Sequence, residues 1–211
     1  NLAYAIIERK LKPSISESIN SLKINLSASD FISYDLISKL NLELDKITKK
    51  LSLWKKHNQC LIHGDLTLEN IFIKEDNIYL IDPLGSTMDI RANGSMQQLT
   101  TPIFDLGKLL QSIISQYESW AYLDKPSIET YIKNFSVEEE ISNISESINL
   151  SKNLISFFEQ YIEGNVINDG LFSLAQILIR VCPYRIRAGY DHSAFVCLLK
   201  SYSIIKYLNN F

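Results

Sequence analysis

The chain has 211 residues, 46% of them hydrophobic and 21% charged, so it can bury one core of ordinary size and need not be disordered. Its 21 basic and 24 acidic side chains give a net charge of −3, which argues against a nucleic-acid partner. The most aliphatic segment, residues 171–182, is interrupted by Ser173, Gln176 and Arg180, and no run reaches the roughly 20 apolar residues that span a bilayer. We therefore expect one soluble globular unit with no membrane partner.

The cysteines and the first residues bear on location. Cys60, Cys182 and Cys197 are an odd number of cysteines at wide spacing, a pattern that fits neither a disulfide framework nor a zinc site. The first ten residues lack the basic start, apolar middle and cleavage site of a secretory signal. The expected location is the cytoplasm.

The first sixty residues carry helical patterns. Ser14 and Glu17 form a capping box, and apolar residues at helical spacing follow as far as Leu26. A longer amphipathic helix of about seven turns is predicted from Asp30 to near His57, because its apolar positions keep to one stripe.

The pattern then changes to short β-type segments. Residues 71–74 and 78–81 are rich in β-forming residues and flank the polar turn 75–77, which predicts a hairpin. The polar residues 85–101, with two glycines, are predicted to form a long irregular loop.

The chain after Pro102 is predicted to be helical. The expected helices cover residues 104–117, 127–134, 137–163, 171–181 and 191–208. Ser136 and Glu139 form a second capping box, and Pro183 is expected to end the penultimate helix because proline has no backbone N–H. The predicted fold class is α+β, mainly α-helical, with one small β-hairpin.

The segment around the hairpin carries the chemistry. Phosphoryl transfer from a nucleotide needs a carboxylate that accepts the proton of the attacking hydroxyl, and oxygen ligands that hold magnesium. Asp65 and Asn70 lie at the two ends of one short loop, and the hairpin returns the chain so that Asp82 follows beside them. The spacing predicts that these three side chains meet at one spot.

These residues resemble the protein-kinase-like superfamily, and within it the aminoglycoside and small-molecule phosphotransferases, which include choline, fructosamine and methylthioribose kinases. His63, Asp65 and Asn70 match the family's H-x-D-x-x-x-x-N catalytic loop, and Asp82 matches the metal-binding Asp after the hairpin. The Asp-Leu-Gly-Lys-Leu segment that begins at Asp105 is similar to the family helix whose Asp braces that loop. The resemblance implies that Asp65 is the catalytic base, that Asn70 and Asp82 bind Mg²⁺ and ATP, and that His63 and Asp105 support the loop.

The resemblance also implies a fold, in which residues 1–211 form the C-terminal catalytic lobe of a kinase-like protein. Family members carry, ahead of the catalytic loop, a β-rich lobe with a glycine-rich loop and a strand lysine. All seven glycines here lie at or after Gly64, so we expect that N-terminal lobe to be absent from this chain, whether it was removed, lies on a partner chain or was lost. The chain alone is expected to bind ATP poorly.

The implied function is an ATP- and Mg²⁺-dependent phosphotransferase that phosphorylates a hydroxyl of a sugar-like small molecule. The motifs also resemble phosphotransferases of bacterial surface-polysaccharide and sugar-nucleotide pathways. The alternative is a catalytically silent kinase-like module that binds or assembles. A glycine-rich loop and a strand lysine upstream of Asn1 would favour the enzyme.

Some of these residues also have a purely structural interpretation. Asp105 could cap the start of its own helix. Arg185, Arg187 and Tyr190 could bind the acceptor, or they could belong to a solvated loop with local salt bridges. A metal-dependent hydrolase is disfavoured, because such sites usually gather several histidines and the chain has three, two of them isolated.

Overall fold

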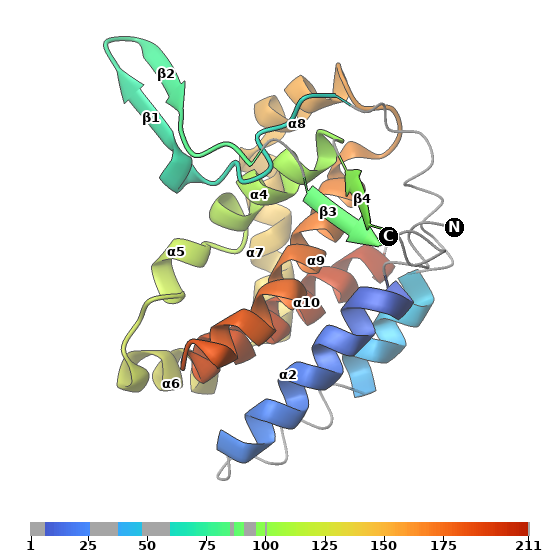
Figure 1. Ribbon diagram of the computed structural model, residues 1–211, viewed down its shortest axis with the longest axis vertical. Coiled ribbons are helices and arrows are strands. Elements are labelled where there is room, and N and C mark those ends of the chain that lie inside the picture. The colour runs from blue at the N-terminus through green and yellow to red at the C-terminus, as the bar shows by residue number, and fades with distance from the viewer. Residues whose placement is uncertain are drawn as a thin grey trace.

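The computed structural model describes residues 7–25, 38–47, 60–84, 87–90, 96–99 and 101–210. The described residues are mainly α-helical and include two separate two-stranded antiparallel sheets (Figure 1). The predicted fold class, α+β and mainly helical, is confirmed at this level.

The first helical segment begins earlier than predicted. A π-helical turn, η1 (Ile7–Leu11), leads directly into helix α2 (Lys12–Asn25), so Ser14 lies inside the helical segment and the predicted capping box is wrong. The reason is the buried stripe, which already includes Leu11 and continues through Ile15.

The second predicted helix is described only in part. Residues 38–47 are helical, and Leu40, Leu44 and Ile47 are buried on one face of that segment. The remainder of the predicted range lies outside the described residues.

Three helices form the centre of the core: α4 (Ile103–Ile113), α9 (Val166–Arg187) and α10 (Asp191–Asn210). Helix α9 packs against α4, α10 and α2, and Figure 1 shows it between them. Helices α4 and α9 cross closely at Gly107 and Ser173. A Cβ atom built on Gly107 would lie only 2.3 Å from the Ser173 hydroxyl oxygen.

Helix α9 is longer than predicted at both ends. It starts after the N-cap Asn165 and continues through Pro183 to Arg187, so the expectation that Pro183 ends it is wrong. Cys182, Pro183 and Arg185 are buried, and this packing outweighs the one backbone hydrogen bond that a proline removes.

Helix α9 also bears on the prediction that the protein is soluble. By length and composition it is the one described helix that could cross a membrane, but 72% of its apolar window is buried inside the protein. That burial is typical of the core helix of a globular protein.

Two of the predicted helices are divided, while the helix predicted over 127–134 begins two residues earlier. The outer helices are α5 (Tyr117–Trp120), α6 (Lys125–Asn134), α7 (Val137–Leu150) and α8 (Lys152–Glu159). Gln116, in a left-handed conformation with φ 50°, separates α4 from α5, and Ser151 separates α7 from α8. Ser136 is confirmed as the N-cap of α7, since its hydroxyl accepts a hydrogen bond from the Glu139 N–H at 3.3 Å; the reciprocal bond of a capping box stays a prediction.

The predicted hairpin is present, with a tighter turn. Strand β1 (Ile71–Lys74) pairs with β2 (Asn77–Leu80), and Lys74 lies opposite Asn77. The turn is therefore the two residues Glu75 and Asp76, which both have positive φ, as a two-residue hairpin turn of type I′ requires.

The predicted loop 85–101 contains a second hairpin, so that prediction is wrong for part of its length. Strand β3 (Thr87–Ile90) pairs with β4 (Met96–Leu99). The sequence signal was the Asn-Gly pair at residues 93–94, a strong hairpin signal between short β-type segments.

Candidate functional site

The backbone ahead of Asp65 is fixed by the first turn of α4. Asp105 accepts hydrogen bonds from the His63 N–H at 2.8 Å and from the Gly64 N–H at 2.7 Å, one on each carboxylate oxygen. Gly64 has φ 83°, a conformation that glycine adopts without steric cost. The N-cap of α4 is Pro102, so Asp105 does not cap its own helix. Its carboxylate instead holds the backbone of the loop before Asp65.

His63 ties this loop to the chain that leaves the hairpin. The ring is buried, its Nε2 lies 2.8 Å from the Ile81 carbonyl oxygen, and its Nδ1 accepts from the Asp65 N–H at 3.3 Å. Together these contacts fit a neutral ring with its proton on Nε2. Both ring nitrogens have protein partners, an arrangement consistent with the predicted role of His63 as a support for the loop.

Asn70 joins the two ends of the loop formed by residues 65–70. It ends the short 3₁₀ helix η3 (Leu68–Asn70), and its Nδ2 lies 2.8 Å from the Asp65 carbonyl oxygen and 3.4 Å from Asp65 Oδ2. The Asn70 carbonyl accepts from the Ile81 N–H at 3.1 Å, and Asp82 is the next residue. The structure thus places Asp65 and Asn70 in contact and the backbone of Asp82 next to them, at one end of the β1–β2 hairpin. That the Asp82 side chain meets the other two stays a prediction.

The donor set at this place is suited to a hard cation. Among the described residues, no group of three or more His, Cys, Asp or Glu side chains is placed to hold a metal ion. Magnesium, however, is usually held by one or two carboxylates together with phosphate oxygens and water. Asp82 has an exposed carboxylate and Asn70 an amide oxygen, the two kinds of ligand on which the predicted magnesium site depends.

One face of α4 contacts the whole loop, and it includes a residue that the sequence did not single out. Asp105, Lys108 and Ser112 are three and four residues apart, a spacing that places them on one helix face. Lys108 Nζ lies 2.8 Å from Asp65 Oδ1, and the Ser112 hydroxyl accepts from the Leu68 N–H at 3.1 Å. The signal for Lys108 was its distance of three residues from Asp105.

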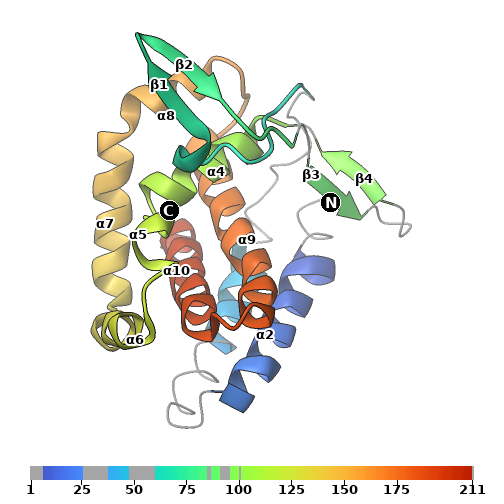
Figure 2. The ribbon, with the colours of Figure 1, turned by 60° about the vertical axis from the view of Figure 1, so that its left-hand side comes forward.

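The β1–β2 hairpin and the loop beside it expose apolar side chains. Leu61 is 93% exposed, Ile73 77%, Ile78 68% and Leu84 67%. In Figures 1 and 2 the hairpin projects from the helical body. Ile73 and Ile78 lie opposite each other across the two strands, and exposed apolar side chains gathered in one place can mark a binding surface.

The proposed acceptor-binding residues lie elsewhere. Helix α4 meets α9 at Ser173, and Arg185 is twelve residues further along α9, which is about 18 Å at 1.5 Å per residue. In both ribbon views the α9–α10 connection lies at the end of α9 away from the β1–β2 hairpin. The structure therefore does not bring Arg185, Arg187 and Tyr190 to Asp65.

Arg185 is occupied by contacts within the protein. Its guanidinium is buried, donates to the Tyr117 hydroxyl and to the Ala121 carbonyl oxygen, and lies over the rings of Tyr117, Tyr122 and Tyr190. It therefore packs the end of α9 against α5. Arg187 and Tyr190 are exposed, and a binding role for them stays a prediction.

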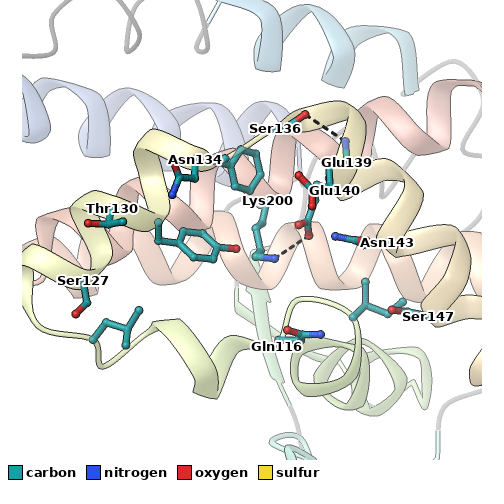
Figure 3. A pocket seen from close by; sticks show the side chains of 14 residues that line it. Gln116, Ser127, Thr130, Asn134, Ser136, Glu139, Glu140, Asn143, Ser147 and Lys200 are labelled. Atoms are coloured by element: carbon teal, nitrogen blue, oxygen red, sulfur yellow. Dashed lines mark hydrogen bonds and ion pairs between the residues drawn. The ribbon is translucent and has the colours of Figure 1, made fainter.

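A concave region lies between α6, α7 and α10. It encloses about 460 Å³ and is lined mainly by hydroxyl, amide and charged side chains. Figure 3 shows the ion pair between Lys200 and Glu140 in its wall, with Nζ and Oε1 2.8 Å apart. None of its lining residues comes from the Asp65 loop, so this region is separate from the candidate site.

Comparison with known proteins gives no relatives: no family model, curated protein or solved structure matches the chain. The functional argument therefore depends on the residues and their geometry.

Proposed function

We propose that this chain is the catalytic lobe of a phosphotransferase that moves the γ-phosphoryl group of ATP to a hydroxyl of a small, sugar-like molecule. The observation that carries the proposal is the contact between Asp65 and Asn70 at the end of the β1–β2 hairpin, with Asp82 following the residue that pairs with Asn70. Asp105 fixes the backbone just before Asp65, and His63 links that backbone to Ile81. The resemblance of these motifs to the protein-kinase-like superfamily supports the same function.

The roles follow from the positions. Asp65 lies on a braced loop and is partly exposed, so an acceptor hydroxyl can reach its carboxylate and give up a proton there. Asn70 and Asp82 would hold Mg²⁺, which when bound neutralises phosphate charge. His63 and Asp105 keep the loop in shape.

The exposed apolar hairpin supports the proposal from another direction. A nucleotide needs cover for its base and phosphates, and the family covers them with a second lobe. Side chains such as Ile73 and Ile78 offer an apolar surface on which such a lobe, or the base itself, would pack. We place that lobe in the parent protein or on a partner chain.

The proposal is tested with the intact gene product that contains residues 1–211. The protein is incubated with γ-labelled ATP, Mg²⁺ and a panel of monosaccharides, and transfer of label is measured for it and for Asp65→Asn. We expect the variant to bind Mg²⁺ and nucleotide normally and to lose about 10²- to 10⁴-fold in turnover, because general-base catalysis contributes that much.

Two other outcomes are informative. Equal transfer by both proteins would remove Asp65 from the role of base. Binding of nucleotide without transfer to any acceptor or to water would favour a catalytically silent binding module.

A further inference from the structure

Lys108 is the one cation that the described structure places against the Asp65 carboxylate. Its Nζ lies 2.8 Å from Oδ1, while the Asn70 amide lies on the side of Oδ2, at 3.4 Å. The two carboxylate oxygens therefore have different surroundings. Oδ1 is held by a charged ammonium group, and Oδ2 has the longer and weaker contact.

The position of Lys108 is fixed by the same helix turn that fixes the loop. Asp105 binds the backbone of His63 and Gly64, and Lys108 on the next turn reaches the side chain that follows them. Its side chain is 21% exposed and that of Asp65 is 36% exposed. The pair is therefore partly open to solvent, which leaves room for a ligand beside it.

The contribution of this ion pair to stability does not by itself account for a lysine at position 108. Pairs at this degree of exposure add little to stability, and the backbone just before Asp65 is already fixed by Asp105. The ammonium has three donors, and Asp65 is its partner within the described part of the chain. The other two donors can reach a further anionic group.

In the proposed reaction, the transferred phosphoryl group would be the anionic group next to Lys108. The attacking oxygen lies within hydrogen-bond distance of Asp65, and it bonds to the phosphorus, so the phosphoryl oxygens pass within a few ångströms of the carboxylate. Phosphoryl transfer is accelerated mainly by positioning and by cations that stabilise charge on those oxygens. A lysine ammonium on a flexible stem suits this task.

We propose that Lys108 is a catalytic residue whose ammonium donates to a non-bridging oxygen of the transferred phosphoryl group while it orients Asp65; this inference rests on the proposed function. The acceptor oxygen forms a bond to phosphorus, and its proton passes to Asp65 Oδ2. The bond from phosphorus to the bridging oxygen breaks, and the nucleoside diphosphate leaves with that electron pair.

The test uses binding, because the acceptor is not identified. Calorimetry on the intact gene product compares ADP with Mg²⁺ against ADP with Mg²⁺ and aluminium fluoride, which occupies the position of the transferred group. For Lys108→Met we expect ADP affinity within about twofold of the parent, and about 100-fold weaker binding of the aluminium fluoride complex, since one such donor contributes 10²- to 10³-fold. Lys108→Arg should recover most of the loss.

Two controls distinguish direct contact of Lys108 with the phosphoryl group from a general loss of charge and from an effect through Asp65. Lys206→Met removes an equivalent charge from the pair with Glu138, at 3.2 Å, and should change neither affinity. In the Asp65→Asn background, Lys108→Met should still weaken the aluminium fluoride complex. If it does not, Lys108 acts only through Asp65 and direct contact is wrong.

The remaining outcomes decide between the two proposals. If the parent does not bind ADP with Mg²⁺, the proposed function fails, and the role of Lys108 fails with it. If the parent binds both complexes and Lys108→Met retains the parent's affinity for each, only the role of Lys108 is overturned. Lys108→Gln, which keeps a polar end, provides the same comparison if the Met variant melts at a lower temperature.

Discussion

Asp105 is the residue on which the geometry of the loop depends most. Its carboxylate is the acceptor for two backbone N–H groups that are buried with it. A buried donor left without a partner costs about 1–3 kcal/mol. Replacing Asp105 therefore affects both the stability of the fold and the position of Asp65.

We predict that Asp105→Ala lowers the free energy of unfolding by about 2–4 kcal/mol, because two buried donors lose a charged acceptor. Urea denaturation measures the change, and Asp105→Asn should lose less because its amide oxygen still accepts one bond. A loss below about 0.5 kcal/mol for Asp105→Ala would show that the loop does not depend on this carboxylate.

The second residue-scale prediction concerns pH. Burial raises the pKa of Tyr117 to about 12, against the opposing effect of the hydrogen bond from Arg185. The folded pKa thus exceeds the unfolded value near 10. The resulting stability is complete below pH 10 and is lost as the pH rises from about 10 to 12.

The melting temperature of the native chain should therefore fall over that interval, and the fall should be smaller in Tyr117→Phe. The variant should also be less stable at pH 7 by about 1–3 kcal/mol, because the Arg185 guanidinium loses an acceptor. Parallel melting curves for both proteins from pH 9 to 12 would contradict the assignment.

At the scale of elements, prediction from sequence succeeded where local signals were strong. The β1–β2 hairpin and α10 follow from their patterns, and Ser136 caps α7 as expected. Prediction from sequence failed where tertiary packing determines the end of a helix, since α9 continues through Pro183 inside the core. Lys108 was missed because a lysine on a helix is ordinarily a solvated residue until its partner, 43 residues away in sequence, is known.

The crossing of α4 and α9 supports the site, because α4 carries Asp105 and Lys108. We predict that Gly107→Ala destabilises the protein by about 1–3 kcal/mol, the usual cost of overpacking, since the new Cβ would lie 2.3 Å from Ser173 Oγ and 2.7 Å from Ser173 Cβ. Adding Ser173→Gly should restore part of the loss in a denaturant titration. If the losses of unfolding free energy from Gly107→Ala and Ser173→Gly simply add in the double variant, the two positions are not in contact.

The link between α7 and α10 gives the next prediction. Lys200 and Glu140 are 5% and 8% exposed and 2.8 Å apart. Removing one member of a buried pair typically costs 3–5 kcal/mol, whereas replacing both by apolar residues is often neutral. Lys200→Met should lower the unfolding midpoint strongly, and Lys200→Met with Glu140→Leu should recover it. Equal midpoints for the single and double variants would contradict a paired role.

At the scale of the whole molecule, the core and the candidate site are separable. The core is formed by α4, α9, α10 and the helices packed on them, while β1 and β2 expose most of their side chains. The sequence predicted that Asp65, Asn70 and the start of the segment at Asp82 lie together, because hairpin spacing is local. It could not predict the acceptor, since the residues that would contact it are not marked by any local pattern.

The last prediction follows from that separation. The 211-residue chain alone should fold, because the core helices share one buried cluster, and should give a helix-dominated circular dichroism spectrum with a cooperative melt. It should not turn over ATP, because phosphoryl transfer depends on positioning and charge stabilisation from both sides of the nucleotide, and the described site supplies one side. Mg²⁺-dependent ATP consumption by the purified chain, lost in Asp65→Asn, would show that these residues form a complete enzyme.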